Sequence, residues 1–252
     1  MEHEKILFGL IGFPLDHSWS PGWYNHKFTA EGETTKEYRL FPLSRIEEFP
    51  SLLKTNPFLA GLNVTIPYKE TVIPYLNELD ETARLIRAVN TIRIIRQGDK
   101  ILTKGFNTDA EGFLLTLKNI SPLVSALILG TGGAAKAVAH ALRTRNIPFT
   151  FVSREGKGPG IISYNDLTPD LIRNNKLIIN TTPMGMFPVT GNYPPIPYHH
   201  LTEDHLLYDL IYNPEVTEFL IRGKSMKAVT MGGMQMLINQ AELSWEIFKT
   251  TP

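Results

Sequence analysis

Residues 125–146 read SALILGTGGAAKAVAHALRTRN, and they decide the fold of the second half of the chain. The apolar run before Gly130 is typical of a buried parallel strand, and the Ala-rich run after Gly132 is typical of a helix. Between them, residues 130–135 match the pattern G-x-G-x-x-A. In this pattern Gly130 permits a tight turn, Gly132 lets the backbone approach a pyrophosphate, and Ala135 keeps the helix close to the strand. The pattern predicts a dinucleotide site; the alternative is a plain glycine-rich turn.

Strand and helix patterns alternate on both sides of this motif, from Asp109 onwards. A helix is predicted over 110–120, and strands are predicted over 148–154, 176–183 and 206–212. This alternation with short connections predicts a doubly wound parallel sheet, the Rossmann-type arrangement. The last predicted element is an amphipathic helix over 234–249.

The N-terminal part has a different pattern. Strands are predicted over 5–11, 35–42 and 60–66, and a β-hairpin over 90–107. Pro21 and Pro67 suit the first position of helices over 21–32 and 67–77, and Asp80 suits the cap of a helix over 81–87.

The change of pattern predicts two α/β domains with a cleft between them. The first is a substrate domain, residues 1–106, completed by the C-terminal helix 234–252. The second is a Rossmann-type dinucleotide-binding domain, residues 107–233.

Composition excludes several classes of function. Lys plus Arg and Asp plus Glu balance at 25 each, which argues against a partner that is a nucleic acid or an anionic membrane. The absence of cysteine excludes disulfides and thiolate chemistry, and the 7 histidines lack a metal-binding spacing. No apolar run approaches the roughly 18 residues of a membrane span, and the N-terminal apolar run is too short for a signal peptide. We expect a soluble, cytoplasmic protein without a bound metal.

The end of the strand after the glycine loop bears on which dinucleotide binds. An enzyme that uses NAD usually has Asp or Glu there for the ribose hydroxyl, whereas one that uses NADP accommodates the phosphate with Arg. Arg154 is near that position, and Lys157 follows it. Both favour NADP. Glu155 would repel the phosphate or bind a free ribose, so NAD stays possible, and Arg154 could also be a solvated charge at the strand end.

Reduction of a ketone by a hydride donor also requires a proton donor, and Lys69 is the best candidate. In the first turn of a helix that begins at Pro67, its charge would oppose the helix dipole, which lowers the lysine pKa from about 10.4. The alternative is an exposed surface lysine. Asp109, between a predicted strand and helix, could either cap that helix or pair with Lys69 across the cleft.

Two serines precede the first predicted helix. Ser20, directly before Pro21, suits a helix N-cap, whereas Ser18 has no such structural role. Two hydroxyls together with amides at a helix start could bind a small carboxylate.

A series of segments in this order resembles the shikimate dehydrogenase family, and the resemblance covers essentially the whole chain. The segments are GFPLDHSWSP, GLNVTIPYK, RAVNTI, GFNTD, LGTGGAAKA, INTTPMGM, DLIYNPEVTEFL and GMQMLINQ.

The resemblance implies a reversible, NADPH-dependent reduction of 3-dehydroshikimate to shikimate, with Lys69 and Asp109 as the catalytic pair. It implies that the substrate's carboxylate and ring hydroxyls are bound by Ser18, Ser20, Thr65, Asn90 and Gln240, with Tyr212 closing the pocket. It implies a cofactor site made of Gly130, Thr131, Gly132, Gly133, Ala134, Ser153, Arg154, Leu210 and Gly233, where Leu210 and Gly233 flank the nicotinamide.

The chain departs from the family around Arg154. The family's Asn-Arg-Thr is Ser153-Arg154-Glu155 here, and its next helix, which carries a second arginine, is replaced by 156–160, too rich in Gly and Pro for a stable helix. Other readings are a quinate/shikimate dehydrogenase that also uses NAD, a non-catalytic sensor of a cyclic polyol acid, and a folate-type methylene dehydrogenase. Intact Lys69 and Asp109 argue against the sensor, and a folate enzyme leaves the segment HSWSP unexplained. Both a monomer and a homodimer are compatible with the sequence.

Overall fold

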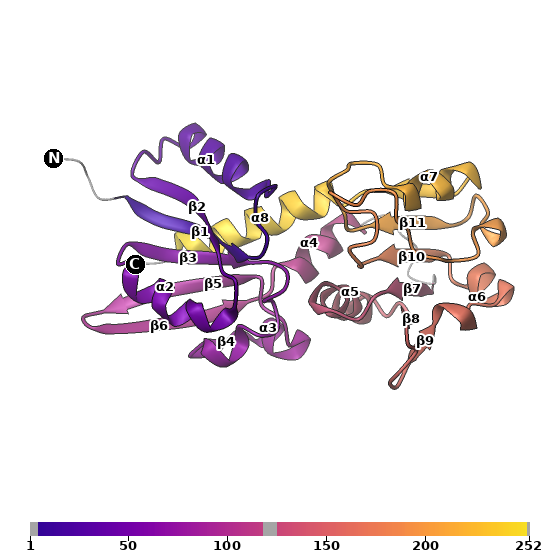
Figure 1. Ribbon diagram of the computed structural model, residues 1–252, viewed down its shortest axis with the longest axis horizontal. Coiled ribbons are helices and arrows are strands. Elements are labelled where there is room, and N and C mark those ends of the chain that lie inside the picture. The colour runs from indigo at the N-terminus through magenta and orange to yellow at the C-terminus, as the bar shows by residue number, and fades with distance from the viewer. Residues whose placement is uncertain (1–4, 118–124, 251–252) are drawn as a thin grey trace. The chain divides into compact units, whose positions relative to one another are not determined.

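The chain forms two compact units, described here from a computed structural model over residues 5–117 and 125–250 (Figure 1). Unit 1 is Met1–Thr108 with Ala241–Pro252, and unit 2 is Asp109–Gln240. The last helix, α8 (Met234–Lys249), therefore contributes residues to both units. The sequence-based bounds assign all of this helix to the first domain.

Unit 1 contains a 6-stranded mixed sheet with the order β2-β1-β3-β5-β6-β4. At its centre β1 (Ile6–Gly12) pairs in parallel with β2 (Lys36–Pro42) and with β3 (Leu59–Val64). The hairpin of β5 (Thr91–Gln97) and β6 (Lys100–Phe106) extends this sheet, with β5 antiparallel to β3. The short β4 (Glu78–Leu79) pairs in parallel with β6 at the edge.

Alternate residues of β1 separate the two hydrophobic cores of unit 1. Leu7 and Ile11 belong to the core that includes Phe49 of α2 (Phe49–Thr55). Phe8 and Leu10 belong to the other core, with α1 (Ser20–Ala30) and with Trp245 of α8, which is fully buried. The remaining helices of unit 1 are α3 (Glu81–Ile86) and the 3-10 turns η1 (Ile46–Glu48) and η2 (Ile73–Tyr75).

A buried polar network joins α8 to the sheet of unit 1. The hydroxyl of Ser244 accepts a hydrogen bond from Asn63 Nδ2 at 3.0 Å and lies 2.7 Å from Thr91 Oγ1 and 3.1 Å from Thr108 Oγ1. All four side chains are buried. A buried polar group that is left without a hydrogen-bond partner destabilises the folded state, so the network fixes the register of α8 on the sheet.

Unit 2 is a doubly wound parallel sheet with the order β12-β11-β10-β7-β8-β9. Its strands are β7 (Ala126–Leu129), β8 (Phe149–Ser153), β9 (Ile161–Ser163), β10 (Leu177–Asn180), β11 (Leu206–Asp209) and β12 (Val229–Met231). Numbered from β7, the order is 6-5-4-1-2-3, the Rossmann arrangement, and the order of the strands reverses between β7 and β10. This confirms the fold class predicted from the sequence.

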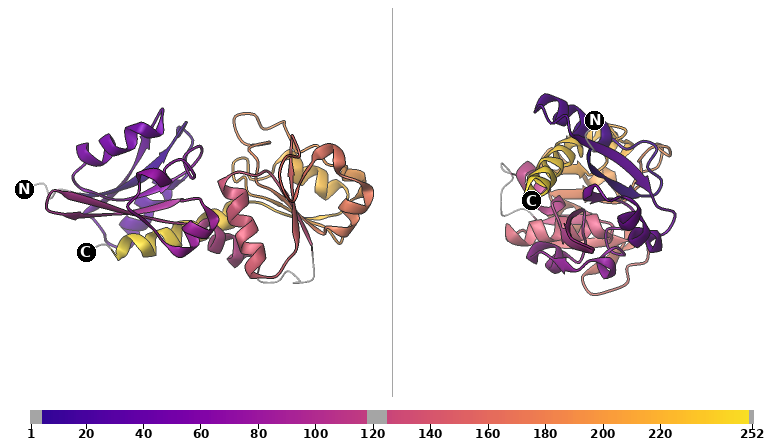
Figure 2. Two further views of the ribbon diagram at one scale, coloured as in Figure 1. Left: turned by 90° about the horizontal axis from the view of Figure 1, so that it is seen from below. Right: turned by 90° about the vertical axis from the view of Figure 1, so that its left-hand side faces the viewer.

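Helices cover both faces of the sheet in unit 2 (Figure 2, left). Ala126 and Ile128 of β7 pack on the side of α4 (Asp109–Thr116) and α5 (Gly133–Thr144). The intervening Leu127 and Leu129 pack on the side of α6 (Pro169–Asn174) and α7 (Glu218–Ser225). The 3-10 turns η3 (Tyr164–Asp166) and η4 (Tyr198–His200) complete the unit.

The helix predicted over 67–77 is wrong. Residues 66–70 form turns, and the only helical residues that follow in this stretch are those of η2. The Lys69 carbonyl accepts a hydrogen bond from Val89 N–H at 2.7 Å, and Ile73 N–H, four positions ahead of Lys69, donates to Glu70 O at 3.3 Å instead. Pro74 has no N–H to donate, and the β-branched residues before it disfavour a helix.

Two other predictions concern helix starts. Asp80 caps α3 as expected, because its Oδ1 accepts the N–H of Ala83 at 2.8 Å. Ser20 is not an N-cap; that position is Trp19, and Ser20 is the first residue of α1. Residues 118–120 of the helix predicted after Asp109 lie outside the described residues.

Among the helices that the structure describes, none is both long and apolar enough to cross a membrane.

Candidate functional site

The register of the sheet in unit 1 brings several predicted site residues to one edge. Thr65 follows β3, and its N–H donates to Ile11 O of β1 at 2.9 Å. Asn90 precedes β5, and its carbonyl accepts the N–H of Val64 at 2.8 Å. Because β5 is antiparallel to β3, its start lies at the edge where β1 and β3 end.

Close backbone contact places the loop after β1 beside the loop after β3. A Cβ on Gly12 would stand 2.4 Å from Thr65 Cγ2. Phe13 N–H donates to Ile66 O at 3.1 Å. Residues 13–18 therefore leave the sheet next to residues 65–69, so Ser18 and Thr65 belong to adjacent loops.

The serines of the predicted carboxylate site are both partly buried. The Ser18 N–H donates to Leu15 O at 3.0 Å within the loop. Ser20 lies close to the buried Tyr38 side chain, whose hydroxyl donates to Asn63 Oδ1 at 2.8 Å. Burial holds the pKa of Tyr38 well above its usual range, so this hydroxyl stays a neutral hydrogen-bonding group next to Ser20.

Lys69 is attached to the same edge through its backbone, because its carbonyl accepts the N–H of Val89, the neighbour of Asn90. The Asn90 side chain is buried; its Nδ2 donates to Thr108 Oγ1 and its Oδ1 accepts the Thr108 N–H, both at 2.8 Å. No helix begins at Pro67, so the prediction that Lys69 lies in the first turn of a helix is wrong.

Asp109 is the residue after Thr108 and the first residue of α4, and its side chain is buried. A carboxylate in the first turn complements the positive end of that helix. Asn90 holds both the N–H and the hydroxyl of Thr108, which fixes the backbone directly before Asp109.

In unit 2 the glycine loop lies at the point where the strand order reverses. Gly130 has φ 109°, and a Cβ on it would stand 2.7 Å from Thr181 Oγ1 after β10. Gly132 is the N-cap of α5, and a Cβ on it meets no heavy atom of the described residues within 4 Å. Thr131 and Gly132 are exposed, while Gly133 and Ala134 form the first turn of α5. Gly130 is therefore required by the fold, and Gly132 borders open space at a helix N-terminus, where anions bind.

The segment after β8 contains the residues that bear on nucleotide choice. The Ser153 hydroxyl at the end of β8 accepts the N–H of Gly156 at 3.0 Å, and Arg154 is exposed. Lys157 Nζ lies 3.0 Å from Glu155 Oε2, and both side chains are largely exposed. Residues 156–160 are not helical, in agreement with the prediction from their composition.

The residues after β11 lie against the start of α8. A Cβ on Gly233 would stand 2.2 Å from Leu210 O, and the Gly233 N–H donates to Ile211 O at 3.1 Å. Any other residue at position 233 would displace the backbone at Leu210. Gln240, further along α8, donates from Nε2 to Leu237 O at 3.0 Å, and a Cβ on Gly112 would stand 3.0 Å from its Cβ.

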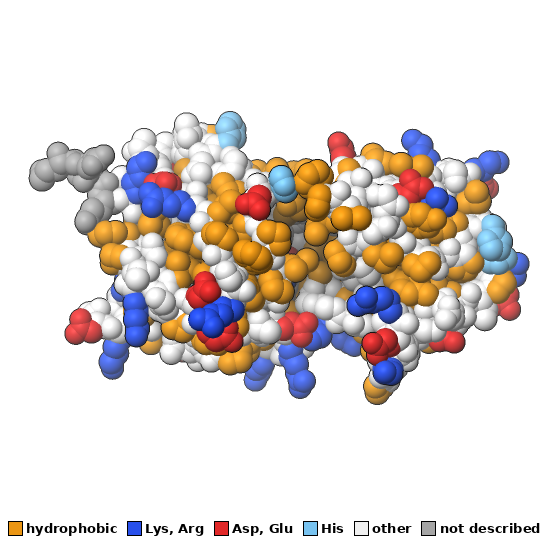
Figure 3. All heavy atoms as spheres, in the orientation of Figure 1, with side chains coloured by type: hydrophobic (Ala, Val, Ile, Leu, Met, Phe, Trp, Pro, Cys, Tyr) orange, Lys and Arg blue, Asp and Glu red, His pale blue; other side chains and the backbone are white. Residues whose placement is uncertain are grey.

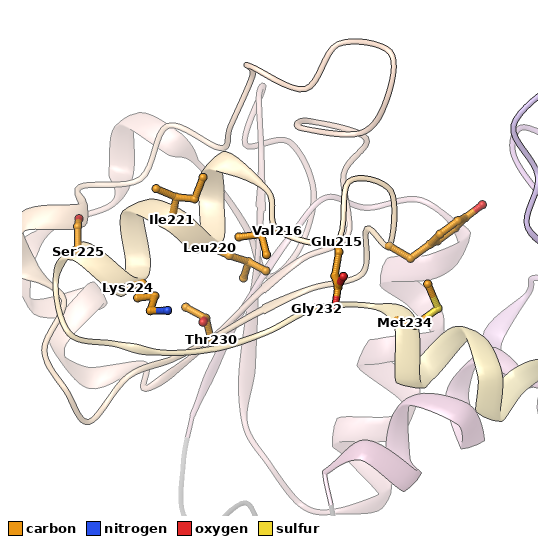
Figure 4. A pocket seen from close by; sticks show the side chains of 10 residues that line it. Glu215, Val216, Leu220, Ile221, Lys224, Ser225, Thr230, Gly232 and Met234 are labelled. Carbon is orange, nitrogen blue, oxygen red and sulfur yellow. The ribbon is translucent and has the colours of Figure 1, made fainter.

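A pocket of about 550 Å³ lies next to these residues. Glu215, Gly232 and Met234 line one end, and Lys224 and Ser225 line the other (Figure 4). Tyr212, which is partly buried, also lines this pocket, but the glycine loop does not.

Sequence reasoning missed Asp209, the last residue of β11. Its side chain is fully buried and accepts hydrogen bonds from Thr217 Oγ1 at 2.6 Å and from Ile211 N–H and Asn180 Nδ2, each at 3.0 Å. Burial raises the pKa of Asp209 to about 6, although the three hydrogen bonds oppose this shift. The signal in the sequence was an acidic residue that closes an apolar strand.

The surface charges show the balance seen in the composition. On the face drawn in Figure 3, acidic and basic side chains are interspersed over both units. Among the described residues, no three His, Asp or Glu side chains are grouped as metal ligands.

Known proteins are similar to this chain along nearly its whole length. Residues 10–92 match the family model described as the shikimate dehydrogenase substrate binding domain. The chain is 35% identical to the shikimate dehydrogenase (NADP⁺) of Methanosphaera stadtmanae, over 97% of this chain and 92% of that protein.

Solved structures are also similar to this chain over nearly its whole length. The shikimate 5-dehydrogenase of Thermus thermophilus, in complex with NADP(H) and shikimate, is 29% identical with a TM-score of 0.83, covering 96% of this chain and 93% of that chain. The quinate dehydrogenase of Corynebacterium glutamicum, in complex with NAD, is 30% identical with a TM-score of 0.83, covering 97% and 93%.

Unit 2 has the fold of a Rossmann-type domain, and unit 1 contains the segment that matches the substrate-domain model. The chain belongs to the shikimate dehydrogenase family.

The two glycines of the loop should respond differently to substitution. Gly130→Ala should lower the free energy of unfolding by roughly 1–3 kcal/mol, because a side chain is strained at its positive φ and meets Thr181. Gly132→Ala should fold normally, because its added methyl group meets open space, but it should weaken NADP⁺ binding at least ten-fold. Thermal unfolding and a fluorescence titration measure the two effects. Unchanged binding by a folded Gly132→Ala protein would show that the dinucleotide does not approach this loop.

Proposed function

We propose that this chain catalyses the reversible, NADPH-dependent reduction of 3-dehydroshikimate to shikimate, a step of chorismate and aromatic amino acid biosynthesis. The observation that carries the proposal is the gathering of Ser18, Thr65, Lys69 and Asn90 on one sheet edge of a chain that matches NADP⁺-dependent shikimate dehydrogenases along nearly its full length. Unit 1 then binds the substrate and unit 2 binds the cofactor.

The substrate is a cyclic acid with several hydroxyls, and unit 1 offers neutral hydrogen-bonding groups for it. Ser18 and Ser20 bind the carboxylate, and the buried, neutral Tyr38 side chain lies close to Ser20. Thr65, Asn90 and Gln240 bind the ring hydroxyls or the carboxylate, and Tyr212 closes the substrate pocket. The network through Asn90 and Thr108 keeps these groups in place before the substrate arrives.

The residues of unit 2 fit a dinucleotide. The open space at Gly132 and the N-terminus of α5 suit the pyrophosphate, which Gly130 to Ala134 hold. Ser153 and Arg154 lie where the adenosine phosphate is expected, and Leu210 and Gly233 lie where the nicotinamide is expected. NADPH supplies the hydride when it is bound.

Lys69 and Asp109 transfer the proton. In the direction of reduction, the Lys69 ammonium donates a proton to the oxygen of the ketone, and in the direction of oxidation the amine accepts it. Asp109 is the partner of Lys69 in this proposed pair. Support comes from the chain of bonds that begins at the Lys69 carbonyl, passes through Val89, Asn90 and Thr108, and ends at the backbone of Asp109.

A second candidate is a quinate/shikimate dehydrogenase that also uses NAD. The observation in its favour is Glu155, which lies at the strand end where an NAD enzyme carries an acidic residue. Its ion pair with Lys157 offsets the negative charge near Arg154 and favours NADP. We place the reaction in the cytoplasm, with a monomer or a homodimer as the active form.

The direct test is an initial-rate assay of shikimate and of quinate, each with NADP⁺ and with NAD⁺. We expect absorbance at 340 nm to rise fastest with shikimate and NADP⁺. A higher kcat/KM with quinate and NAD⁺ would support the second candidate. No turnover with any of the four pairs would overturn the proposal that the chain is a dehydrogenase.

Arg154 should set the preference for NADP. A charge-assisted contact to phosphate contributes roughly 1.5–3 kcal/mol, which is about ten- to a hundredfold in affinity. Arg154→Ala should therefore raise the KM for NADP⁺ by that factor and leave the KM for NAD⁺ nearly unchanged. Arg173→Ala, an exposed arginine on α6, is the matched control and should change neither. Equal losses with both nucleotides would instead indicate a structural role for Arg154.

Lys69 and Asp109 should behave as one catalytic pair. General acid–base groups contribute about 10²–10⁴-fold to a rate, so Lys69→Ala should lower kcat at least a hundredfold while shikimate binding changes far less. Asp109→Asn should also lower kcat, and the double variant should be scarcely slower than Lys69→Ala. Lys54→Ala, at an exposed lysine of α2, is the control. If the two losses multiply in the double variant, the residues act independently; near-full turnover by Lys69→Ala would exclude Lys69 as the proton donor.

A further inference from the structure

Asp209 is a buried carboxylate without a counter-ion. Its hydrogen-bond donors are the hydroxyl of Thr217, the amide of Asn180 and the backbone of Ile211, all of which are neutral. The groups that act on the pKa of Asp209 are these three donors together with burial, and no lysine, arginine or histidine of the described residues is among them. Since buried charges in proteins are normally paired, an unpaired carboxylate at this position calls for a partner that the chain does not provide.

Ionisation of Asp209 lowers the free energy of unfolding. Burial raises the pKa of Asp209 to about 6, so ionisation at neutral pH works against the folded state. Asn180 Oδ1 is already used by the N–H and hydroxyl of Thr182, at 3.0 Å and 2.7 Å, which leaves Nδ2 to face Asp209. The network is thus oriented to keep the carboxylate ionised.

The place of Asp209 in the sheet indicates what the partner is. It is the last residue of β11 and directly precedes Leu210, whose carbonyl lies against Gly233. In a doubly wound sheet the second set of three strands, here β10, β11 and β12, carries the second mononucleotide at its carboxyl ends. For the proposed cofactor, that mononucleotide contains the nicotinamide.

We propose that the Asp209 carboxylate is the electrostatic partner of the oxidised nicotinamide ring. This inference rests on the proposed function. The ring carries one positive charge in NADP⁺ and none in NADPH, so a fixed negative charge nearby favours the oxidised form. Asp209 therefore promotes departure of the hydride from NADPH, and it also holds the loop after β11 in place.

Separate binding measurements for the two redox forms test the proposal. Asp209→Asn removes the charge and nearly preserves the size of the side chain. Two unit charges about 10 Å apart at an effective dielectric constant of about 20 change affinity on the order of ten-fold. We expect the Kd for NADP⁺ to rise by about that factor and the Kd for NADPH to change less than about three-fold. The Kd for 2′-phosphoadenosine diphosphate, which lacks the nicotinamide, should stay the same.

A matched control separates charge from loop position. Thr182→Val removes a hydroxyl of the same network, the one that donates to Asn180, and leaves the carboxylate intact. It should change the Kd for NADP⁺ and the Kd for NADPH by the same factor. If Asp209→Asn also changes both by one factor, Asp209 acts only through the loop and the proposal is overturned.

The wild-type protein provides a second measurement that does not require the variant to fold. The ratio of the Kd for NADPH to the Kd for NADP⁺ should rise between pH 5 and pH 7.5, as Asp209 ionises with its pKa of about 6. The adenosine phosphate titrates in the same range but is common to both forms, so it cancels in the ratio. Asn180, Ile211 and Thr217 do not titrate. Tyr198, a residue of η4, interacts electrostatically with Asp209, but burial raises the pKa of Tyr198 far above this pH range.

A constant ratio over this range would overturn the proposal. Failure of the proposed function looks different: in that case neither form of NADP binds and no shikimate-dependent turnover is seen.

Discussion

Parallel pairing of the central strand with both neighbours is the constraint on which each unit depends. In unit 1, β1 lies between β2 and β3, and in unit 2, β7 lies between β8 and β10. Parallel strands use their backbone groups along their whole length, but the loops at their carboxyl ends converge on one edge. Ser18 and Thr65 follow such ends in unit 1, as Gly130 and Arg154 do in unit 2. The candidate groups are therefore assembled by strand direction, from segments far apart in the sequence.

Glycines mark the places where these converging loops come closest. Gly12 lets the loop after β1 contact Thr65, Gly130 lets the loop after β7 contact Thr181, and Gly233 lets the start of α8 contact Leu210. Each of the three would bring a Cβ within 2.7 Å of a neighbour, so each is required by packing alone. Gly132 differs, because a side chain there meets open space. Among these glycines, it is the one whose small size the fold does not explain, and that points to a ligand.

Features that depend on neighbouring residues were predictable from the sequence, and features that depend on distant partners were not. The hairpin of β5 and β6, the cap at Asp80 and the amphipathic helix α8 follow from local patterns. The stretch 67–77 has a proline at a plausible helix start, but a hydrogen bond from Val89 to Lys69 and the proline at 74 prevent the helix. Asp209 was missed because its hydrogen-bond partners, Asn180, Ile211 and Thr217, lie in separate segments that only the fold brings together. The candidate residues of both units were predicted from motifs in order, and their roles stay predictions. The buried network of unit 1 through Ser244 had no sequence signal.

The two units differ in the kind of polar group that each of them buries near its own candidate residues. Unit 1 buries a neutral network, in which Asn63, Thr91, Thr108 and Ser244 are bonded to one another. Unit 2 buries the carboxylate of Asp209 among neutral donors. In the proposed reaction an alcohol group of the substrate and a ketone are interconverted, and neither group is charged. The nicotinamide ring of the cofactor, in contrast, is positive in NADP⁺ and neutral in NADPH. A neutral, fully bonded network suits a partner whose charge is constant, because its task is to hold geometry. A fixed charge opposite a group whose charge changes favours one redox form over the other, and in the proposed reaction the group whose charge changes is the nicotinamide.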